Sequence, residues 1–600
     1  MTRHVVTLFS AVVMSGALLA CEGRHRTESA TDVREGARNA AFIAVLDVSD
    51  GLPEQPSGGL LGLSSKSASF DELVREVDRL ERDSKNNVKG ILVRLGTARL
   101  GVARATEVGA LLARVAAHRP VWCHADELGN GTLYLAAVGC RQVWISPGGT
   151  VDAIGLAAQL VFFHKLLADG LGLDVDFLQV GKYKGAEEPF TRDDPSPEAR
   201  ASLESTLADM RTAWLTGIRR ARPAISASAA EDGPYTARAA QDRGLVDQVG
   251  YFDEARDELE KETRTAHAEV RLGPGAGSRA GGDIAEVLHA LAGESLGGAP
   301  IALVHATGAI SMDGAGPLGG DSGIVESRLA RTLVRLERDD DVKAVVLRID
   351  SPGGSALASD LLWHHLMRVR KRKPLVVSIG DMAASGGYYM ASAGSIVFAD
   401  EASIVGSIGV VGGKVAIGHA LEKLGVHAET VPARVGDAKS ASRATYESLL
   451  TPWDDDTRTR LLETMTGIYG LFLARIGEGR GLPIDRVALS AEGRVFSGRE
   501  GKARGLVDEM GGLGDALVRA RVLAGLPPDA RVGVAGEPSG ILQMLAQDES
   551  QGQAASRLSG IALAHFAPDV VAFVASIAPL AGLAPREPAL CALPFALTVR

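Results

Sequence analysis

A serine at position 385 has neighbours that suit a nucleophile. It lies in the segment GDMAASGGYY, directly after the apolar run PLVVSI and before a predicted helix. A nucleophilic serine needs a sharp strand-to-helix turn that presents its hydroxyl, and small neighbours let a substrate backbone approach closely. The backbone N–H of Gly386 can then bind the negative charge that develops on a carbonyl oxygen. Small residues around a serine also mark ordinary tight turns, so Ser385 needs support from elsewhere in the chain.

A second glycine-rich segment could assist such a serine. Residues 348–355 read RIDSPGGS and come at the end of another apolar run. Gly353 and Gly354 free two backbone N–H groups at a strand end, where a carbonyl oxygen or an anion can be held. The alternative is a purely structural role, in which the two glycines serve only a turn that needs a positive φ.

A lysine is the candidate for the base that a serine nucleophile needs, because no histidine accompanies these two segments. A lysine can act as a base only when its amine is neutral, so its reference pKa of about 10.4 must fall by several units. Lys184 lies in VGKYKGAEEPF (180–190), together with a second lysine, an aromatic residue and small residues. Since most lysines are solvated surface residues, the choice of Lys184 depends on how the chain is organised.

The chain is internally repeated. VKGILVRL at 88–95 matches VKAVVLRI at 342–349, and GNGTLYLAAVG at 129–139 matches ASGGYYMASAG at 384–394. Both copies also close with a similar signature, YTARAAQDRGLVDQVG in the first and FSGREGKARGLVDEMG in the second. The duplication therefore covers whole domains.

The two copies differ where a reaction would take place. In the register of the second match, Ser385 corresponds to Asn130 of the first copy (385 − 130 = 255). Lys184 corresponds to Lys439 in the same register (439 − 184 = 255), but the surrounding VGDAKSASRAT has lost the rest of the lysine segment. The first copy also lacks the Pro-Gly-Gly turn. We therefore predict one composite active site, in which each half supplies what the other has lost.

The predicted fold class is α/β, with two tandem domains. A chain of 600 residues is too long for one core. In each copy, short and nearly continuous apolar strands alternate with helical stretches, which indicates βαβ units and a parallel sheet. The predicted organisation is a lipoprotein-type signal peptide at 1–20, a tether at 21–40, an N-terminal domain at 41–262, a Gly/Ala-rich linker at 263–299, a C-terminal domain at 300–535 and a tail at 536–600 that packs on the body or on another subunit.

The N-terminus is a predicted targeting segment. Arg3 and His4 precede an apolar run from Val5 to Ala20 that is short for a membrane span, and the run ends LLAC at Cys21. This pattern is similar to a bacterial lipobox, in which cleavage frees Cys21 for lipid attachment; the alternative is an uncleaved apolar anchor. In both cases we expect a membrane-anchored protein of the bacterial cell envelope that faces the periplasm.

Several function classes are disfavoured. A formal charge of −10 without a basic stripe argues against a nucleic-acid partner. There is no HExxH motif and no histidine-rich cluster, so no metal and no cofactor is expected. The spacing of Cys123, Cys140 and Cys591 fits no metal site, and Cys123 and Cys140 either pair or remain as free buried thiols.

Together these segments resemble signal peptide peptidase A in its long, duplicated form, a family of serine–lysine peptidases with the Clp protease/crotonase fold. The resemblance extends from about residue 41 to 535. It implies that Ser385 is the nucleophile and that Lys184, rather than Lys182, is the general base. Ser407, in the segment IVGSIGV, would orient the lysine. One departure is the lipobox-like end of the apolar segment, where relatives of this length carry a transmembrane helix.

The resemblance also implies further properties. The backbone amides of Gly354 and Gly386 would bind the oxyanion, the first domain would give the lysine, and the second would give the serine. The expected substrates are apolar peptides such as cleaved signal peptides, and the expected assembly is a homotetramer. Two other functions stay open, a non-catalytic exported lipoprotein scaffold and a crotonase-type acyl-CoA enzyme.

Overall fold

The computed structural model describes a chain of two similar domains, with the residue ranges 41–54, 68–82, 87–270, 298–312, 323–536 and 590–592. The predicted signal peptide, the tether and Cys21 lie outside the described residues. Most of the predicted linker and most of the predicted tail lie outside them as well.

The first domain is built on a mainly parallel sheet with the strand order β6-β4-β3-β2-β1-β8, and β7 also pairs with β4. Its strands are β1 (Phe42–Asp47), β2 (Val88–Gly96), β3 (Val121–Leu128), β4 (Gln142–Val151), β6 (Tyr235–Thr236), β7 (Gln248–Val249) and β8 (His267–Val270). Its helices include α3 (Phe70–Glu81), α4 (Val102–Ala116), α5 (Asn130–Gly139), α7 (Pro197–Ala221), α8 (Ala227–Glu231), α9 (Ala237–Asp242) and α10 (Phe252–Thr263).

The second domain repeats this architecture, with the strand order β18-β16-β14-β12-β9-β20; in addition, β15 pairs with β14, and β19 pairs with β15. Its strands are β9 (Ile301–Thr307), β12 (Ala344–Ser351), β14 (Leu375–Ala384), β15 (Ile396–Ala399), β16 (Ile404–Gly406), β18 (Val495–Ser497), β19 (Glu509–Met510) and β20 (Val532–Ala535). Its helices include α12 (Glu326–Arg338), α13 (Ala356–Arg372), α14 (Gly386–Ala391), α17 (Asp455–Arg480), α18 (Ile484–Ala488), α19 (Gly498–Ala503) and α20 (Leu513–Leu523).

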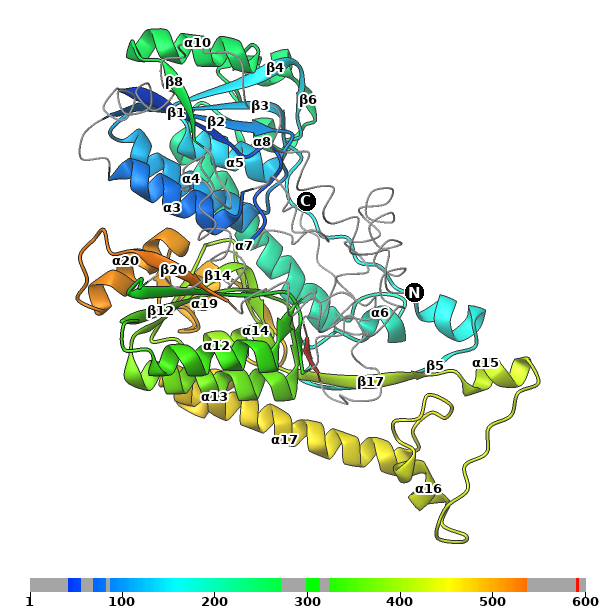
Figure 1. The fold of residues 1–600 in the computed structure, drawn as a ribbon. Coiled ribbons are helices and arrows are strands. Elements are labelled where there is room, and N and C mark those ends of the chain that lie inside the picture. The colour runs from blue at the N-terminus through cyan, green and yellow to red at the C-terminus, as the bar shows by residue number, and fades with distance from the viewer. Residues whose placement is uncertain are drawn as a thin grey trace, which may run out of the picture.

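The buried strands explain why this fold forms. β12 reads AVVLRIDS and is buried along almost its whole length, as expected for a parallel strand that is covered on both faces. Figure 1 shows α12 and α13 on one side of the second sheet and α20 on the other, between that sheet and α3 of the first domain. The core around α20 accordingly contains side chains of both domains.

A third sheet connects the domains, with the order β11-β10-β13-β21-β17-β5. Its strands are β5 (Asp174–Val180), β10 (Ile310–Ser311), β11 (Ile324–Val325), β13 (Gly353–Ser355), β17 (Val410–Ala416) and β21 (Leu590–Ala592). β5 belongs to the first domain and pairs antiparallel with β17 of the second. Figure 1 shows these two strands side by side, leading out to an arm that carries α15 (Gly418–Lys423) and α16 (Ala438–Ala444).

Two segments depart from the predicted boundaries. β8 lies inside the predicted linker and pairs with β1, so the predicted linker start at residue 263 is too early. The sequence HAEV at this edge position is short and half polar, so it does not predict a strand. In the predicted tail, β21 is part of the third sheet, so three residues of the tail pack on the body of the protein.

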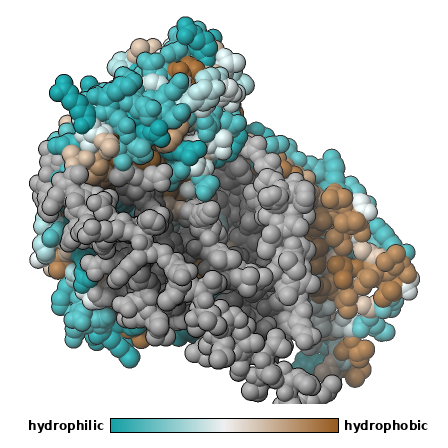
Figure 2. Space-filling view, turned by 45° about the horizontal axis from the view of Figure 1, so that its top comes forward, coloured by the Kyte–Doolittle hydropathy of each residue, from teal (hydrophilic) through white to brown (hydrophobic). Residues whose placement is uncertain are grey.

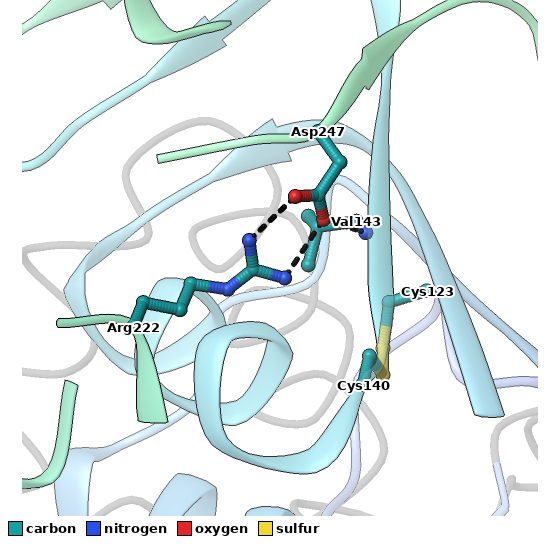
Figure 3. Close-up of a disulfide and its surroundings, with 5 residues drawn as sticks. All are labelled: Cys123, Cys140, Val143, Arg222 and Asp247. Carbon is teal, nitrogen blue, oxygen red and sulfur yellow. Dashed lines mark hydrogen bonds and ion pairs between the residues drawn. A yellow bond between two sulfur atoms is a disulfide. The ribbon is translucent and has the colours of Figure 1, made fainter. Parts of the chain in front are cut away.

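A disulfide decides between the two states that the sequence left open for Cys123 and Cys140. The two sulfur atoms are bonded, with the Cα atoms 5.8 Å apart, and they join β3 to the end of α5 (Figure 3). Beside them, Arg222 pairs with Asp247, whose carboxylate also accepts a hydrogen bond from the Val143 backbone (Figure 3).

A cluster of buried charges also joins the domains. Arg348 of β12 is fully buried, and its guanidinium lies 2.9 Å from both Glu54 Oε1 and Glu107 Oε1 of the first domain. Burial alone would raise the pKa of Glu54, but the charge and hydrogen bonds of Arg348, together with the charges of Arg104 and His305, outweigh burial and hold that pKa at about 2. Burial raises the pKa of Glu107 to about 7 against the attraction of Arg348. The contacts of this one arginine therefore couple the two domains.

Candidate active site

Lys184 reaches the second domain through β5. Val180, the last residue of β5, pairs with Val410 of β17, and the chain then turns towards the core of the second domain. The backbone N–H of Tyr183 donates to the carbonyl of Glu492 (2.8 Å), which fixes the turn against the second domain. As a result, Lys184 is fully buried.

Two glycines of the second domain leave the space that Lys184 occupies. A Cβ on Gly493, whose φ is 82°, would lie 2.5 Å from the backbone nitrogen of Lys184. A Cβ on Gly409 would lie 3.1 Å from Cδ of the same lysine. The sequence prediction missed both glycines, although Gly409 is part of the IVGSIGV segment that pointed to Ser407.

The lysine amine meets both predicted serines. Lys184 Nζ lies 2.8 Å from Ser385 Oγ, 2.9 Å from Ser407 Oγ and 2.9 Å from the Ser407 carbonyl oxygen. All three side chains are fully buried. The structure thus brings together residues that lie 201 and 223 positions apart in the chain. This arrangement suits proton transfer between a hydroxyl and an amine, because the two atoms are within hydrogen-bond reach.

Ser385 has the backbone geometry of a nucleophile turn. It lies between the end of β14 and the start of α14, with φ 55° and ψ −115°, a region that residues other than glycine rarely adopt. Its N–H donates to the Gly406 carbonyl (2.7 Å), and its carbonyl accepts from Tyr389 N–H (2.8 Å). Such a conformation costs on the order of 1–3 kcal/mol and persists only where the surroundings enforce it. The sharp turn predicted from the sequence is therefore present.

The Pro-Gly-Gly segment packs against this turn. A Cβ on Gly386 would lie 3.3 Å from Gly353 Cα and 2.5 Å from Ser359 Oγ. A Cβ on Gly354, whose φ is 154°, would lie 2.1 Å from the carbonyl oxygen of Ile310. Only glycine fits these positions, so the glycines keep two backbone segments in direct contact beside Ser385.

The repeat counterparts of Ser385 and Lys184 lie in different surroundings. Asn130 stands at the start of α5, where its side chain donates to the Gly155 carbonyl (2.7 Å) and accepts from Ile154 N–H (3.2 Å). Lys439 is exposed on α16, in the arm. Neither residue lies in a buried dyad like that of Lys184 and Ser385.

Glu187 is a buried carboxyl close to the lysine that the sequence prediction did not single out. Burial raises its pKa to about 8, the neighbouring Glu188 adds to the rise, and the charge of Lys184 opposes it. Below about pH 8 Glu187 is therefore protonated and does not favour the charged form of the lysine.

A lysine that acts as a base only when neutral would make kcat/KM rise towards alkaline pH, and replacing Glu187 by glutamine is expected to move that rise to lower pH. Above pH 8 the ionised carboxylate of the wild type opposes loss of the proton from Lys184, and an uncharged amide does not. The measurement is the pH profile of kcat/KM for Glu187→Gln beside Glu204→Gln, a variant of an exposed residue on α7. Equal midpoints in the two variants would contradict the prediction.

In the described ranges, no three histidine, cysteine, aspartate or glutamate side chains group together as a metal site.

Comparison with known proteins gives the family. The model described as peptidase family S49 matches residues 113–266 and 367–527, one segment in each domain. This chain belongs to peptidase family S49. A Clp protease model also matches residues 322–405, and together with the two parallel sheets these matches confirm the predicted fold class and its duplication.

Several curated proteins of this kind are similar to the chain. The chloroplastic serine protease SPPA of Arabidopsis thaliana is 30% identical over 66% of this chain and 58% of its own length. Protease 4 of Salmonella typhi is 31% identical over 68% of this chain and 64% of its own length. Protease 4 of Haemophilus influenzae is 30% identical over 78% of this chain and 75% of its own length. The chain thus spans less than two thirds of the first two relatives.

Among solved structures, a ClpP1 mutant from Listeria monocytogenes matches with a TM-score of 0.22 and 14% identity, over 36% of this chain and 94% of that one.

Proposed function

We propose that this member of family S49 is a serine endopeptidase with Ser385 as nucleophile and Lys184 as general base. The observation that carries the proposal is the buried contact of 2.8 Å between Lys184 Nζ and Ser385 Oγ. Relatives named as serine protease and Protease 4 support it. A non-catalytic scaffold would have no use for this contact, and an acyl-CoA enzyme would not need it.

The reaction would proceed through an acyl-enzyme. The neutral amine of Lys184 takes the hydroxyl proton as Ser385 Oγ attacks the peptide carbonyl carbon. The carbonyl oxygen becomes an oxyanion held by the N–H groups of Gly354 and Gly386. The C–N bond then breaks, the lysine gives its proton to the leaving amine, and a water activated by the lysine releases the acyl group.

Ser407 would position the lysine for these steps. Its hydroxyl and its carbonyl oxygen both lie 2.9 Å from Lys184 Nζ, so they fix the direction of the amine. Ser407 itself is held at φ 54° by a hydrogen bond from its N–H to the Arg494 carbonyl (2.6 Å). Burial supports the neutral amine because moving a charged group out of water is costly.

An active-site probe tests the proposed function. A fluorophosphonate, which reacts with activated serines, is expected to label the full-length protein at alkaline pH, and peptide mapping is expected to place the label on Ser385. A protein that remains unlabelled, or a label on another serine, would overturn the assignment.

The proposed substrates are apolar peptides, such as cleaved signal peptides, cut at the membrane face of the bacterial cell envelope, on the periplasmic side. The apolar N-terminal segment ending at Cys21 supports attachment to a membrane. Among the helices that the structure describes, none combines the length and the apolar character needed to cross a bilayer.

We also propose that the protein works as a homo-oligomer, with a tetramer as the expected state. The arm between β17 and α17 exposes apolar side chains, including Leu424, Val426, Val431 and Val435, which are 51–96% exposed. Figure 2 shows apolar side chains gathered on the side of the molecule where Figure 1 places α15. Exposed apolar patches of this kind support contact with another protein surface.

A further inference from the structure

The strand that leads to Ser385 is irregular where it passes the strand that leads to the Pro-Gly-Gly turn. β12 and β14 run parallel, and three residues of β14 (380–382) lie opposite one residue of β12, Asp350. The regular pairs on either side of this bulge are Ile349 with Ile379 and Ser351 with Ala383. Extra residues in a strand interrupt the ladder of backbone hydrogen bonds, so other groups have to hold the bulge in place.

The carboxylate of Asp350 replaces the missing backbone pairing. Its Oδ1 accepts the N–H of Met382 (3.2 Å), which lies in the bulge. Asp350 comes three residues before Gly353 of the Pro-Gly-Gly turn (353 − 350 = 3), and Met382 comes three residues before Ser385 (385 − 382 = 3). This hydrogen bond therefore ties the strand of the oxyanion turn to the strand of the nucleophile.

Arg104 of the first domain binds both strands at this point. Its Nη2 donates to Asp350 Oδ2 (2.9 Å) and lies 3.0 Å from Asp381 Oδ2 in the bulge. The same nitrogen lies 3.2 Å from Glu54 Oε1, and Nη1 donates to the carbonyl of Leu52 (3.0 Å). The arginine side chain is 14% exposed, so these ion pairs are largely shielded from water, where they are stronger than at the surface.

The start of helix α4, which carries Arg104, is also fastened to the bulge. Asp381 Oδ1 accepts the backbone N–H of Arg104 (3.3 Å), one of the first-turn N–H groups that find no partner within a helix. The N-cap residue is Gly101, and a Cβ on it would lie 2.8 Å from Asp381 Oδ1. A carboxylate of the second domain therefore caps a helix of the first, in the space that a glycine leaves open.

The charges at the bulge show why the cation matters. Burial raises the pKa of Asp350, and the charges of Asp381 and Glu54 raise it further, whereas the charges of Arg104 and Arg348 lower it. Arg104 lies within ion-pair distance of both Asp350 and Asp381. Without Arg104 the two carboxyls lose the group that binds both of them, and repulsion or proton uptake replaces the attraction between the strands.

The first copy of the repeat has a different arrangement at this point. In β2 and β3, which the structure describes in full, no extra residue of β3 lies opposite β2 here. The pairs are Arg94 with His124 and Gly96 with Ala125. Gly96 corresponds to Asp350 of the second copy, because 350 − 96 and 342 − 88 both equal 254. The bulge and the carboxylate that holds it therefore belong to the copy that carries Ser385.

We propose that Arg104 of the first domain is a positioning residue, which aligns Ser385 with the oxyanion turn by holding Asp350 and Asp381 together at the bulge. The proposal rests on the proposed function and gives the first domain a second contribution to the same site, besides Lys184. Because the contacts of Arg104 cross between the domains, the alignment depends on their docking. A misplacement of about 1 Å can cost about 10²-fold in rate, so the effect belongs in kcat.

The variant Arg104→Met tests the positioning role in the full-length protein. We expect kcat for an apolar peptide ester to fall about 10²-fold with KM unchanged, because only the alignment in the transition state is lost. Arg99→Met is the matched control, since Arg99 lies five positions away (104 − 99 = 5) and its side chain is 77% exposed. Equal kcat values in the two variants, or a loss that appears in KM alone, would overturn the proposal.

Variants of Asp350 test whether Arg104 acts through it. Asp350→Leu removes the acceptor for the Met382 N–H, whereas Asp350→Asn keeps an oxygen there, so the leucine variant is expected to lose more kcat. In a double-mutant cycle, Arg104→Met is expected to add little to the loss in Asp350→Leu. Losses that multiply would show that Arg104 acts by another route and would overturn the proposal.

A neutral variant separates positioning from stability. Arg104→Met/Asp350→Asn/Asp381→Asn removes the unpaired charges, and asparagine can still cap α4. Its urea midpoint of unfolding is expected to return towards that of the wild type while kcat stays low, because no cation binds both strands. A kcat that recovers together with the midpoint would reduce Arg104 to a structural role and overturn the proposal.

Hydrogen exchange reports on the bulge without catalysis. A peptide that covers residues 380–387 is expected to exchange faster in Arg104→Met than in Arg99→Met. Unchanged exchange would overturn the positioning role, while probe labelling of Ser385 in the wild type would keep the proposed function. Faster exchange in a protein whose Ser385 no probe labels would overturn the proposed function, and the role in catalysis with it.

Discussion

Replacing Lys184 by methionine is expected to lower kcat/KM by about 10⁴-fold while the protein stays folded. The thioether side chain fills the narrow space beside Gly409 and Gly493 but cannot take the proton of Ser385. Steady-state kinetics with an apolar peptide ester measure the loss, and the urea midpoint of unfolding reports on the fold. The matched control is Lys182→Met, because Lys182 is exposed two positions away and lies over the Tyr183 ring.

The double variant Lys184→Met/Ser385→Ala makes this prediction sharper. If the two residues act as one unit, the double variant loses no more activity than either single variant, since each alone removes the same proton-transfer step. Losses that multiply would show that Lys184 and Ser385 contribute independently. Activity in Lys184→Met equal to that of the Lys182→Met control would reject the lysine as base.

The three side chains of the site were predictable because their neighbours are unusual. Ser385 lies in a run of small residues after an apolar strand, and Lys184 lies in a segment whose repeat counterpart has lost everything except Lys439. In the structure, Lys184 is buried against Ser385, whereas Lys439 is exposed on the arm. Asymmetry between two copies of one fold was therefore the signal for which copy carries which group.

The route by which Lys184 reaches the serine was not predictable from periodicity. β5 has the sequence DVDFLQV and is mostly half-buried, and its partner β17 belongs to the other domain. Pairing between strands more than 200 positions apart leaves no local pattern in either segment. β21 is harder still, since a strand of only three residues between two prolines, Pro588 and Pro594, does not stand out from a loop.

Two arginines at the same position of the repeat show that the burial of a side chain depends on the partner domain. Arg94 and Arg348 occupy the same place in the repeated segments VKGILVRL and VKAVVLRI. Arg94 pairs with Asp47 (3.4 Å), and its side chain is 43% exposed, whereas the side chain of Arg348 is fully buried against the first domain. The local sequence is nearly the same, so the difference comes from which face of each sheet the other domain covers.

Replacing Arg348 by methionine is expected to lower the free energy of unfolding by about 3–5 kcal/mol, the usual cost of removing one partner from a buried ion pair. The change leaves Glu54 and Glu107 buried and facing each other without the cation between them. Glu107, which is fully buried beside Arg348, then has to take up a proton or remain as a buried charge without a cation, whereas Glu54 keeps its ion pair with Arg104 (3.2 Å). Urea unfolding followed by tryptophan fluorescence measures the effect.

Two further variants separate the charge from the packing. In the triple variant Arg348→Met/Glu54→Leu/Glu107→Leu, no charge of this triad remains, and most of the lost stability is expected to return, as it does when buried ion clusters are replaced by apolar residues. Arg238→Met, a change of an exposed residue on α9, is expected to unfold at the same urea concentration as the wild type.

A triple variant as unstable as Arg348→Met alone would show that the cluster acts through its shape. A stable single variant would mean that water or neighbouring groups compensate the two carboxylates. The expected order, with the single variant lowest and the triple variant restored, follows because desolvated charge without a counter-charge is the costly state.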